Sequence, residues 1–131
     1  MHLIASEADL AALLAAPLAL LYKHSPICPT SGVAYEEVLA FRRRTRVPVF
    51  LVDVVKHRPL ARALAEHIGV VHASPQAIIL REGVPAWHRS HFDIQAEAMR
   101  RVVSHLSEGG EGGESGDGGE GGDDGEDGKG G

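Results

Sequence analysis

The sequence predicts an α/β fold, in which helices flank a central mixed sheet of about four strands and a disordered tail follows. Three observations lead to this prediction. Two short apolar runs, at residues 18–24 and 47–54, are separated by a segment with helical spacing of its apolar residues. Residues 75–90 have the pattern of two strands joined by a tight turn. From Glu108 onward the chain is almost only glycine, glutamate and aspartate, which cannot form a core.

The composition divides the chain into one domain, residues 1–107, and a tail, residues 108–131. The tail holds 13 of the 16 glycines and 9 of the 18 acidic residues, so we expect it to be disordered and to act as a solvating linker. An arm that competes for a basic site is the less favoured alternative. Residues 1–107 carry 12 Lys and Arg against 9 Asp and Glu, a surplus of 3 positive charges. This surplus is too small to indicate a nucleic-acid partner.

No segment of the sequence is typical of a membrane span or a signal peptide. The apolar stretch at residues 10–21 is shorter than a membrane-spanning helix and is broken by Pro17. Acidic residues, rather than basic ones, precede it. The single cysteine cannot form an internal disulfide, as is usual for a protein of the reducing cytosol. We therefore expect a cytoplasmic protein that works as a monomer and has no membrane partner.

The first half of the chain predicts a parallel strand–helix–strand unit. Ser6 and Asp9 form a weak capping box for a first helix, which Pro17 ends. Residues 18–24 then predict a strand that is buried on both faces, and residues 47–54 predict a second strand. A strand, a crossover helix and a strand in this order form a right-handed parallel unit. The crossover helix places apolar residues on one face: Ala34, Val38 and Phe41.

The second half predicts a helix at residues 58–69 and a hairpin at residues 75–90 with Glu82 and Gly83 in its turn. Asp93 is expected to cap a last helix. The order of elements is therefore α-β-α-β-α-β-β-α, which is the thioredoxin-like layout of a mixed sheet covered by helices. The apolar residues that repeat every four positions in the last helix are Ile94, Ala98, Val102 and Leu106.

The lone cysteine, Cys28, lies where the first strand of the parallel unit ends and its helix begins. Pro29 suits the first position of a helix, which makes Cys28 the expected N-cap residue. There the sulfur faces the unpaired amides of Thr30 and Ser31 and the positive end of the helix dipole, which favour the thiolate. An inert buried cysteine is the alternative, but such residues lie away from helix starts. We therefore predict a reactive thiol.

The neighbours of Cys28 define the expected chemistry further. Ser31 occupies the place of the second cysteine in a C-x-x-C redox pair. The site cannot close its own disulfide, so an outside thiol must resolve any disulfide formed at Cys28. Lys23 and His24 are expected to add positive charge near the sulfur.

Ser74 and Pro75 form the second candidate feature of the site. They come just before the first strand of the hairpin. In thioredoxin-like folds this place holds a cis proline beside the active thiol. The layout therefore predicts a cis bond here, with the backbone groups of Ser74 exposed to pair with an extended substrate backbone.

Three sequence boxes resemble those of one known family. The segments "KHSPICPTS", "HASPQ" and "WHRSHFDI" match a KHS-x-x-CP-x-S box, an H-x-SPQ box and a WH-x-SH-x-DI box in that order. Across about residues 8–107 the sequence is similar to the monothiol bacilliredoxins, redox-active proteins of the bacillithiol system. The resemblance implies a thioredoxin fold and one catalytic cysteine. It also implies removal of bacillithiol from oxidised cytosolic proteins, by attack of that cysteine on the mixed disulfide.

Carried over residue by residue, the resemblance makes Cys28 the nucleophile and Pro75 the cis proline, with Pro29 and Ser31 completing the cysteine motif. The implied partners are S-bacillithiolated proteins and bacillithiol, which acts as a co-substrate. No tightly bound cofactor is expected.

Two departures from the family lie beside the nucleophile, where the family commonly has Thr before the cysteine and Ile two residues after it. This chain has Ile27 and Thr30 there, a difference that bears on substrate preference or thiol pKa and leaves the nucleophile intact. Bacillithiol carries a malate dicarboxylate, whose matching positive charge is expected from Lys23, His24 and His72, with simple surface exposure as the open alternative. The expected substrate-binding residues are therefore Lys23, His24, Thr30, His72, Ser74 and Pro75.

Other roles for these residues remain open. Monothiol proteins of another branch share an iron–sulfur cluster, but they use C-G-F-S where this chain has C-P-T-S. A redox sensor whose lone thiol is capped under stress is a third possibility. A metal site formed by Cys28, His88 and His91 is disfavoured because the histidines fall at a strand end and in the following loop, and we expect no metal. Asp53, at the end of its strand, is expected to cap the next turn rather than to relay protons.

Overall fold

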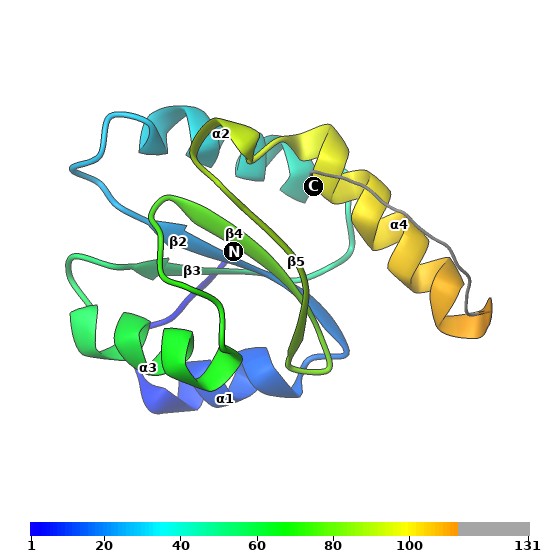
Figure 1. The fold of residues 1–131 in the computed structure, drawn as a ribbon, viewed down its shortest axis with the longest axis horizontal. Helices are drawn as coiled ribbons and strands as arrows, with labels where there is room; N and C mark the ends of the chain where they lie inside the picture. Colours follow the sequence, from blue (N-terminus) through cyan, green and yellow to red (C-terminus); the bar gives the residue numbers. More distant parts are fainter. Residues whose placement is uncertain (113–131) are drawn as a thin grey trace. The chain divides into compact units, whose positions relative to one another are not determined.

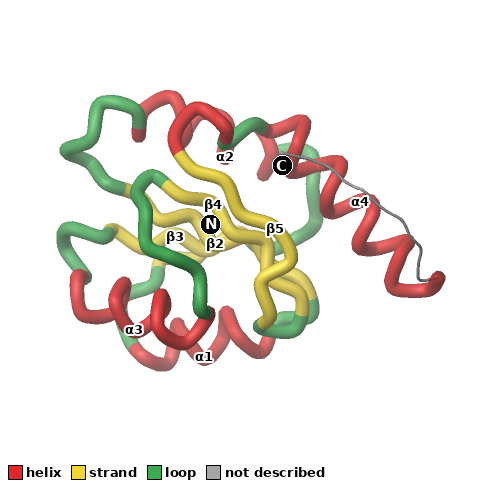
Figure 2. The backbone as a smooth tube through the Cα atoms, in the orientation of Figure 1, coloured by secondary structure: helices red, strands yellow, loops and turns green. Residues whose placement is uncertain are grey.

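The computed structural model describes residues 1–112, with side chains as far as Ser107, and contains a five-stranded mixed sheet with helices on both faces (Figure 1, Figure 2). The strands lie in the order β1-β3-β2-β4-β5. In chain order the elements are β1 (His2–Leu3), α1 (Glu7–Ala15), β2 (Leu18–His24), α2 (Ser31–Arg42), β3 (Val49–Asp53), α3 (Arg58–Ile68), β4 (Gln76–Arg81), β5 (Val84–Ser90), the 3₁₀ helix η1 (His91–Asp93) and α4 (Ala96–Gly112).

Residues 1–100 form one compact unit that contains the whole sheet, and the chain from Arg101 onward belongs to a second unit. The helix α4 continues past Ser107, the end of the predicted domain, to Gly112. The remainder of the predicted tail, residues 113–131, lies outside the described residues. In the part of the chain that is described, no helix has the length and apolar character needed to cross a membrane.

The sheet combines the predicted parallel unit with the predicted hairpin. The central strand β2 runs parallel to β3, with Tyr22 opposite Leu51, and antiparallel to β4, with Lys23 opposite Gln76. β5 pairs with β4 and completes the hairpin. At the other edge, β1 pairs in parallel with β3 through only two residues. The sequence does not predict this fifth strand, because so short a run has no periodic pattern.

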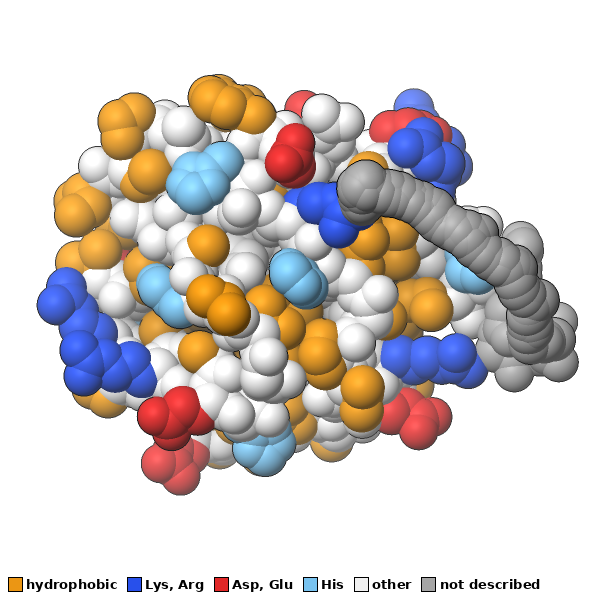
Figure 3. Space-filling model, viewed as in Figure 1, with side chains coloured by type: hydrophobic (Ala, Val, Ile, Leu, Met, Phe, Trp, Pro, Cys, Tyr) orange, Lys and Arg blue, Asp and Glu red, His pale blue; other side chains and the backbone are white. Residues whose placement is uncertain are grey.

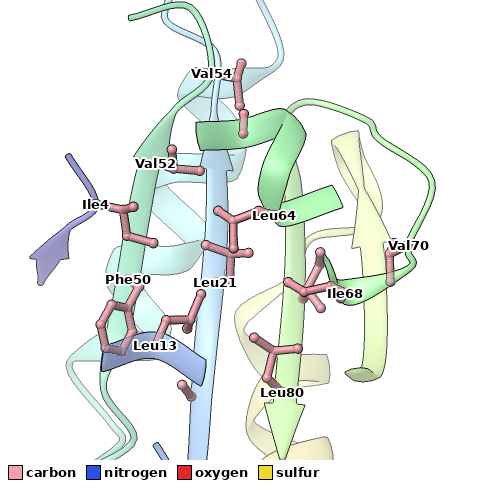
Figure 4. Close-up of a cluster of buried hydrophobic side chains, with 13 residues drawn as sticks. Ile4, Leu13, Leu21, Phe50, Val52, Val54, Leu64, Ile68, Val70 and Leu80 are labelled. Carbon is pink, nitrogen blue, oxygen red and sulfur yellow. The ribbon is translucent and has the colours of Figure 1, made fainter. Parts of the chain in front are cut away.

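The main core lies between the sheet and the pair of helices α1 and α3 (Figure 4). Successive residues of a strand point to opposite faces of a sheet. Leu21 of β2 belongs to this core, so its neighbours Leu20 and Tyr22 face the opposite side, where α2 lies. The side chains that α2 buries include the three predicted from their spacing, Ala34, Val38 and Phe41.

Both ends of α1 confirm the predicted signals. Ser6 Oγ accepts a hydrogen bond from the backbone N–H of Asp9 at 3.3 Å, and the Asp9 carboxylate accepts one from the N–H of Ala5 at 2.9 Å. At the other end, Ala16 is already extended, with ψ of 139°. The helix stops there because a residue before a proline is driven out of the helical region, and Pro17 follows.

The start of α4 differs from the prediction. Asp93 ends the short helix η1 and does not cap α4, which begins at Ala96. The Ala96 N–H donates instead to the carboxylate of Glu37 in α2, at 2.7 Å. A local sequence pattern cannot reveal a capping group that is 59 residues away. The buried face of the first turn also differs, since Met99 is fully buried and Ala98 only partly.

The hairpin turn at Glu82 and Gly83 requires glycine at its second position. Gly83 has φ of +80°, and a Cβ there would lie 3.0 Å from the carbonyl oxygen of Leu14. We expect Gly83→Ala to lower the free energy of unfolding by about 1–3 kcal/mol, because a side chain is strained in left-handed backbone and would also meet Leu14. Urea unfolding of the full-length proteins measures the difference.

A matched control for this prediction lies in α2. A Cβ on Gly32 would meet no atom within 4 Å. Alanine in a helix is favoured over glycine by about 0.5–1 kcal/mol, so Gly32→Ala is expected to leave stability unchanged or to raise it. Equal losses in the two variants would contradict the argument from backbone conformation.

Candidate functional site

Cys28 lies in the loop between β2 and α2, where backbone hydrogen bonds hold it on both sides. Its N–H donates to the carbonyl of Ser25 at 3.1 Å, and its own carbonyl accepts the N–H of Ser31 at 3.0 Å. The second bond closes a tight turn, so α2 begins at Ser31 with Thr30 as its N-cap residue. The prediction that Cys28 is the N-cap and Pro29 the first helical residue is therefore wrong. The Cys28 side chain is half-buried.

The surroundings of Cys28 lower the pKa of its thiol. The largest cause is the side-chain hydroxyl of Thr30, whose oxygen lies 3.2 Å from Sγ. The backbone N–H of Thr30 follows, and the N–H and hydroxyl of Ser31 contribute less, while partial burial opposes them. A lower pKa raises the fraction of thiolate, which is the nucleophilic form. The amides predicted from the sequence do contribute, but the Thr30 hydroxyl contributes more.

Ser31 supports this loop from the inside of the protein. The residue is 2% exposed, and its Oγ accepts the N–H of Ser25 at 3.3 Å. Its carbonyl accepts a hydrogen bond from the Tyr22 hydroxyl, also at 3.3 Å. The place of a second cysteine is thus taken by a buried hydroxyl that fixes the loop, and Cys28 remains the only thiol of the sequence.

His24 does not supply the positive charge that the sequence predicts beside the thiol. Its ring contacts the rings of Tyr22 and Tyr35, with centroids 5.5 and 5.3 Å apart, which places it on the α2 face of the sheet. Its Nδ1 lies 3.1 Å from the Tyr22 hydroxyl oxygen. Burial lowers the pKa of His24, so the ring is mainly neutral at neutral pH.

Lys23 points to the opposite face of the sheet and is enclosed by the protein. It is 1% exposed, and its Nζ donates to Oε1 of Gln76 at 3.0 Å. Burial lowers the pKa of the ammonium to about 8. The expected direct contact between Lys23 and a ligand does not fit this burial. Its hydrogen bond instead ties the end of β2 to the start of β4.

The buried ammonium predicts a pH dependence of stability. The pKa of Lys23 is about 8 in the folded protein and 10.5 in an ordinary lysine, so the unfolded chain binds more protons between these values. The free energy of unfolding therefore rises with pH across this window. We expect a Cys28→Ala protein, which has no thiol to titrate, to gain stability from about pH 8 to pH 10. Urea unfolding measures this change.

Lys23→Met in the same Cys28→Ala background is expected to lose the rise. Replacing the lysine leaves Gln76 without its hydrogen-bond donor, and this loss is the same at every pH. Burial raises the pKa of Tyr22 from 10.0 to about 12, so Tyr22 opposes the rise only as the pH approaches 10, and it does so in both proteins. Equal slopes of stability against pH in the two proteins would show that Lys23 is not the titrating group.

The structure confirms that the bond between Ser74 and Pro75 is cis. Pro75 is buried, and its carbonyl accepts the N–H of His91 at 3.1 Å. Within residues 1–112, neither the N–H nor the carbonyl of Ser74 is hydrogen-bonded to another protein group. Both are therefore available to the backbone of a bound chain.

A groove of about 480 Å³ opens beside this segment. Exposed His72 lies on its wall, and burial together with the nearby ammonium of Lys23 lowers the pKa of His72. Of the three residues predicted to meet ligand carboxylates, His72 alone borders this groove. Sequence reasoning did not single out the two arginines that also line it. The polar lining consists of Ser25, Arg58, Arg62, Glu66, His72 and Ser74.

Exposed apolar side chains occur on the segments that carry Cys28 and Pro75. Ile27 is 78% exposed, Val71 is 88% exposed, and Phe92 of η1 is 62% exposed. Figure 3 shows hydrophobic side chains at the surface over the β2–α2 loop and the start of α2. Exposed apolar groups beside a site favour contact with an apolar partner. Ile27 was noted from the sequence as a departure from the family, whereas Val71 and Phe92 carry no sequence signal of this role.

Asp53 has the structural role that the sequence predicts. Its Oδ1 accepts the N–H groups of Val55 and Lys56, each at 2.9 Å. Its carbonyl accepts the N–H of His57, also at 2.9 Å. The carboxylate therefore fixes the turn from β3 into α3, and with it the first residue of α3, Arg58.

The histidines of the third box lie on β5 and η1. His88 is exposed on β5, and the backbone of His91 supports Pro75 through the hydrogen bond described above. His91 has φ of +54°, so the chain turns sharply there into η1. Among the residues with described side chains, no three His, Cys, Asp or Glu are grouped so that they could hold a metal ion.

Comparison with known proteins agrees with this geometry. The family model "Monothiol bacilliredoxin BrxC" matches residues 3–99. A protein described as an oxidoreductase with a thioredoxin fold superposes with a TM-score of 0.73 at 25% identity, over 78% of this chain and 92% of that chain. A mutant thioredoxin from Halobacterium salinarum (TM-score 0.65, 14% identity, 79% and 87% covered) and Fasciola hepatica thioredoxin (0.64, 19%, 80% and 98%) share the fold. The predicted thioredoxin-like fold is confirmed, with five strands rather than about four.

Proposed function

Since this chain belongs to the monothiol bacilliredoxin BrxC family, we propose that it is a thiol-disulfide oxidoreductase that removes bacillithiol from protein mixed disulfides. The family and the oxidoreductase neighbour support thiol redox chemistry. One observation carries the proposal: a half-buried Cys28 thiol with a lowered pKa has a serine where a second cysteine would stand. The partners are S-bacillithiolated proteins and bacillithiol, in the cytoplasm, and the protein acts as a monomer without a tightly bound cofactor.

The first step is a thiol–disulfide exchange at Cys28. The Cys28 thiolate attacks the bacillithiol sulfur of the mixed disulfide, and a new S–S bond joins Cys28 to bacillithiol. The bond between bacillithiol and the target protein breaks at the same time. The target cysteine leaves with the electron pair and takes a proton from water. The Thr30 hydroxyl lowers the pKa of Cys28 and so favours the thiolate for this attack.

The second step needs a thiol from solution, because Ser31 cannot attack the new disulfide. The thiolate of a free bacillithiol attacks the bacillithiol sulfur held on Cys28. A disulfide of two bacillithiol molecules forms, and Cys28 leaves as the thiolate. The protein then returns to its reduced state, and the bacillithiol disulfide carries away the oxidising equivalents.

The target chain binds beside Pro75 in this proposal. The free N–H and carbonyl of Ser74 pair with an extended segment of the target, as strand addition to an exposed backbone does. The exposed side chains of Ile27, Val71 and Phe92 contact apolar groups around the target cysteine. This arrangement accepts many sequences, because backbone groups and apolar surface supply most of the contacts.

Mass spectrometry of the full-length protein tests the first step. Treatment with the disulfide of bacillithiol is expected to add one bacillithiol unit at Cys28, which fresh thiol removes and prior alkylation blocks. Turnover of an S-bacillithiolated protein in excess tests the cycle. Many turnovers per chain support an enzyme. Release of a single equivalent followed by arrest would instead indicate a redox sensor that is capped at Cys28.

A further inference from the structure

The groove lined by Ser25 and Ser74 has a wall with two arginines that the proposed mechanism does not use. Arg58 and Arg62 are four residues apart, so they lie one above the other on the same face of α3. Both line the groove, with Ala61 between them in the same lining. Figure 3 shows Lys and Arg side chains gathered over the start of α3. Arginine presents a planar fork of donors that matches a carboxylate.

A buried positive charge lies near the same groove. The ammonium of Lys23 is 1% exposed, and its hydrogen-bond acceptor, Gln76, is a neutral amide. In the described part of the chain, no carboxylate lies within ion-pair distance of Lys23. Its charge acts on His72, which lines the groove, so the ammonium lies close to that wall. An unpaired charge in a poorly polarisable interior raises the affinity of the neighbouring surface for anions.

The lining of the groove combines residues from two sources. Ser25, whose carbonyl accepts the N–H of Cys28, and Ser74, which precedes Pro75, come from the segments of the candidate site. Arg58 and Arg62 come from α3. A volume of about 480 Å³ is within the range of sites for small molecules, about 300–1,000 Å³. A ligand in this groove would contact both the cysteine loop and the arginines, which suits a small thiol that also carries negative charge.

We propose that this groove is the binding site for the small thiol, with Arg58 and Arg62 pairing with its malate dicarboxylate while its sulfur reaches Cys28. The assignment rests on the proposed function, in which bacillithiol is the co-substrate. It replaces Lys23 and His24, one buried and the other on the opposite face of the sheet, as the groups that pair with the carboxylates. Glu66 lies one turn beyond Arg62 in the same lining and opposes the anion.

Binding of a thiol-free probe tests the site independently of the redox chemistry. Glucosaminyl malate is titrated into the full-length protein, followed by amide NMR shifts, and methyl glucosaminide is the probe without carboxylates. We expect shifts at Ser25, along α3 and at His72 for the first probe only. Arg58→Gln/Arg62→Gln is expected to weaken binding about tenfold or more. Glu66→Gln is expected to strengthen it severalfold.

The control removes the same charge elsewhere. Arg43→Gln/Arg44→Gln lowers the net charge equally at the exposed C-terminal end of α2 and is expected to leave the affinity unchanged. Equal weakening in the two double variants would overturn the site, because only overall charge would then matter. Equal affinity for the two probes, or shifts confined to other surfaces, would overturn it as well.

Turnover separates the failure of this site from the failure of the proposed function. With S-bacillithiolated protein and bacillithiol as reductant, Arg58→Gln/Arg62→Gln is expected to raise the KM for bacillithiol about tenfold and to leave kcat nearly unchanged. With a malate-free thiol, glucosaminyl cysteine, the variant and the wild-type protein are expected to behave alike. If the double variant is impaired equally with bacillithiol and with glucosaminyl cysteine, or with neither, the binding site is overturned while the proposed function stands. Specific binding of glucosaminyl malate without any turnover supports the site and overturns the function.

Discussion

We expect Cys28→Ala to abolish the removal of bacillithiol from mixed disulfides. We expect it also to abolish the mass increase after treatment with bacillithiol disulfide. The sequence holds no other thiol, so no second nucleophile can take over. The loss is expected to be complete within detection, at least about a thousandfold, because neither alanine nor a neighbouring hydroxyl forms a disulfide. Release of bacillithiol from a labelled target protein measures the rate.

The fold is expected to survive this substitution. The hydrogen bonds that hold the loop run through the backbone of Cys28, and alanine keeps them. Thermal unfolding of the variant within a few degrees of the wild-type Tm confirms that the loss is chemical. Ser31→Ala keeps the thiol and is expected to slow turnover only modestly, although it also removes the acceptor of the Ser25 N–H. Turnover that persists in Cys28→Ala would remove the basis of the proposed function.

Thr30→Val is expected to raise the pKa of Cys28, because the Thr30 hydroxyl is the largest cause of its lowering. Valine has nearly the shape of threonine and keeps the backbone N–H, so the substitution isolates the hydroxyl. At neutral pH the thiolate fraction falls, and both alkylation by iodoacetamide and turnover are expected to slow severalfold. The acidic limb of the pH–rate profile moves to higher pH.

The same substitution predicts a different result in alkaline solution. Once both thiols are ionised, the variant is expected to react as fast as the wild-type protein or slightly faster, because nucleophilicity rises with thiol pKa. Thr30→Ser keeps the hydroxyl and is the matched control, with a profile near that of the wild-type protein. Superimposable profiles for Thr30→Val and the wild-type protein would assign the ionisation to the helix amides instead.

The sequence could predict the order of elements because each has a local cause. The capping pair of Ser6 and Asp9, the break at Pro17 and the turn at Gly83 act within a few residues of where they stand. The two-residue strand β1 has no such pattern, and its existence depends on pairing with β3. The prediction therefore succeeded for long periodic segments and missed the edge of the sheet.

The same distinction between local and long-range causes applies to the candidate site. The place of Cys28 before a helix, and that of Pro75 before a hairpin, followed from the layout of strands and helices. Lys23 is buried against Gln76, its hydrogen-bond acceptor, which is 53 residues away. No local pattern therefore distinguishes this buried lysine from an exposed one. Arg58 and Arg62 carry no local sequence signal of a binding role. Only the folded chain brings them to the groove beside His72.

The three boxes of the family resemblance gain a common explanation from the structure. The first forms the loop around Cys28, and the second forms the cis segment at Pro75. The third follows in β5 and η1, where the N–H of His91 binds the carbonyl of Pro75. The third box thus supports the second through the backbone of His91.

The buried hydroxyl of Ser31 in the position of a second cysteine has a kinetic consequence. A pair of cysteines resolves a mixed disulfide within one molecule, in a first-order process whose rate is independent of what surrounds the protein. Cys28 has no such neighbour, so any disulfide that it forms persists until another molecule collides with it. Removal of that disulfide is therefore a second-order reaction. The lifetime of the oxidised state is inversely proportional to the concentration of the surrounding thiol.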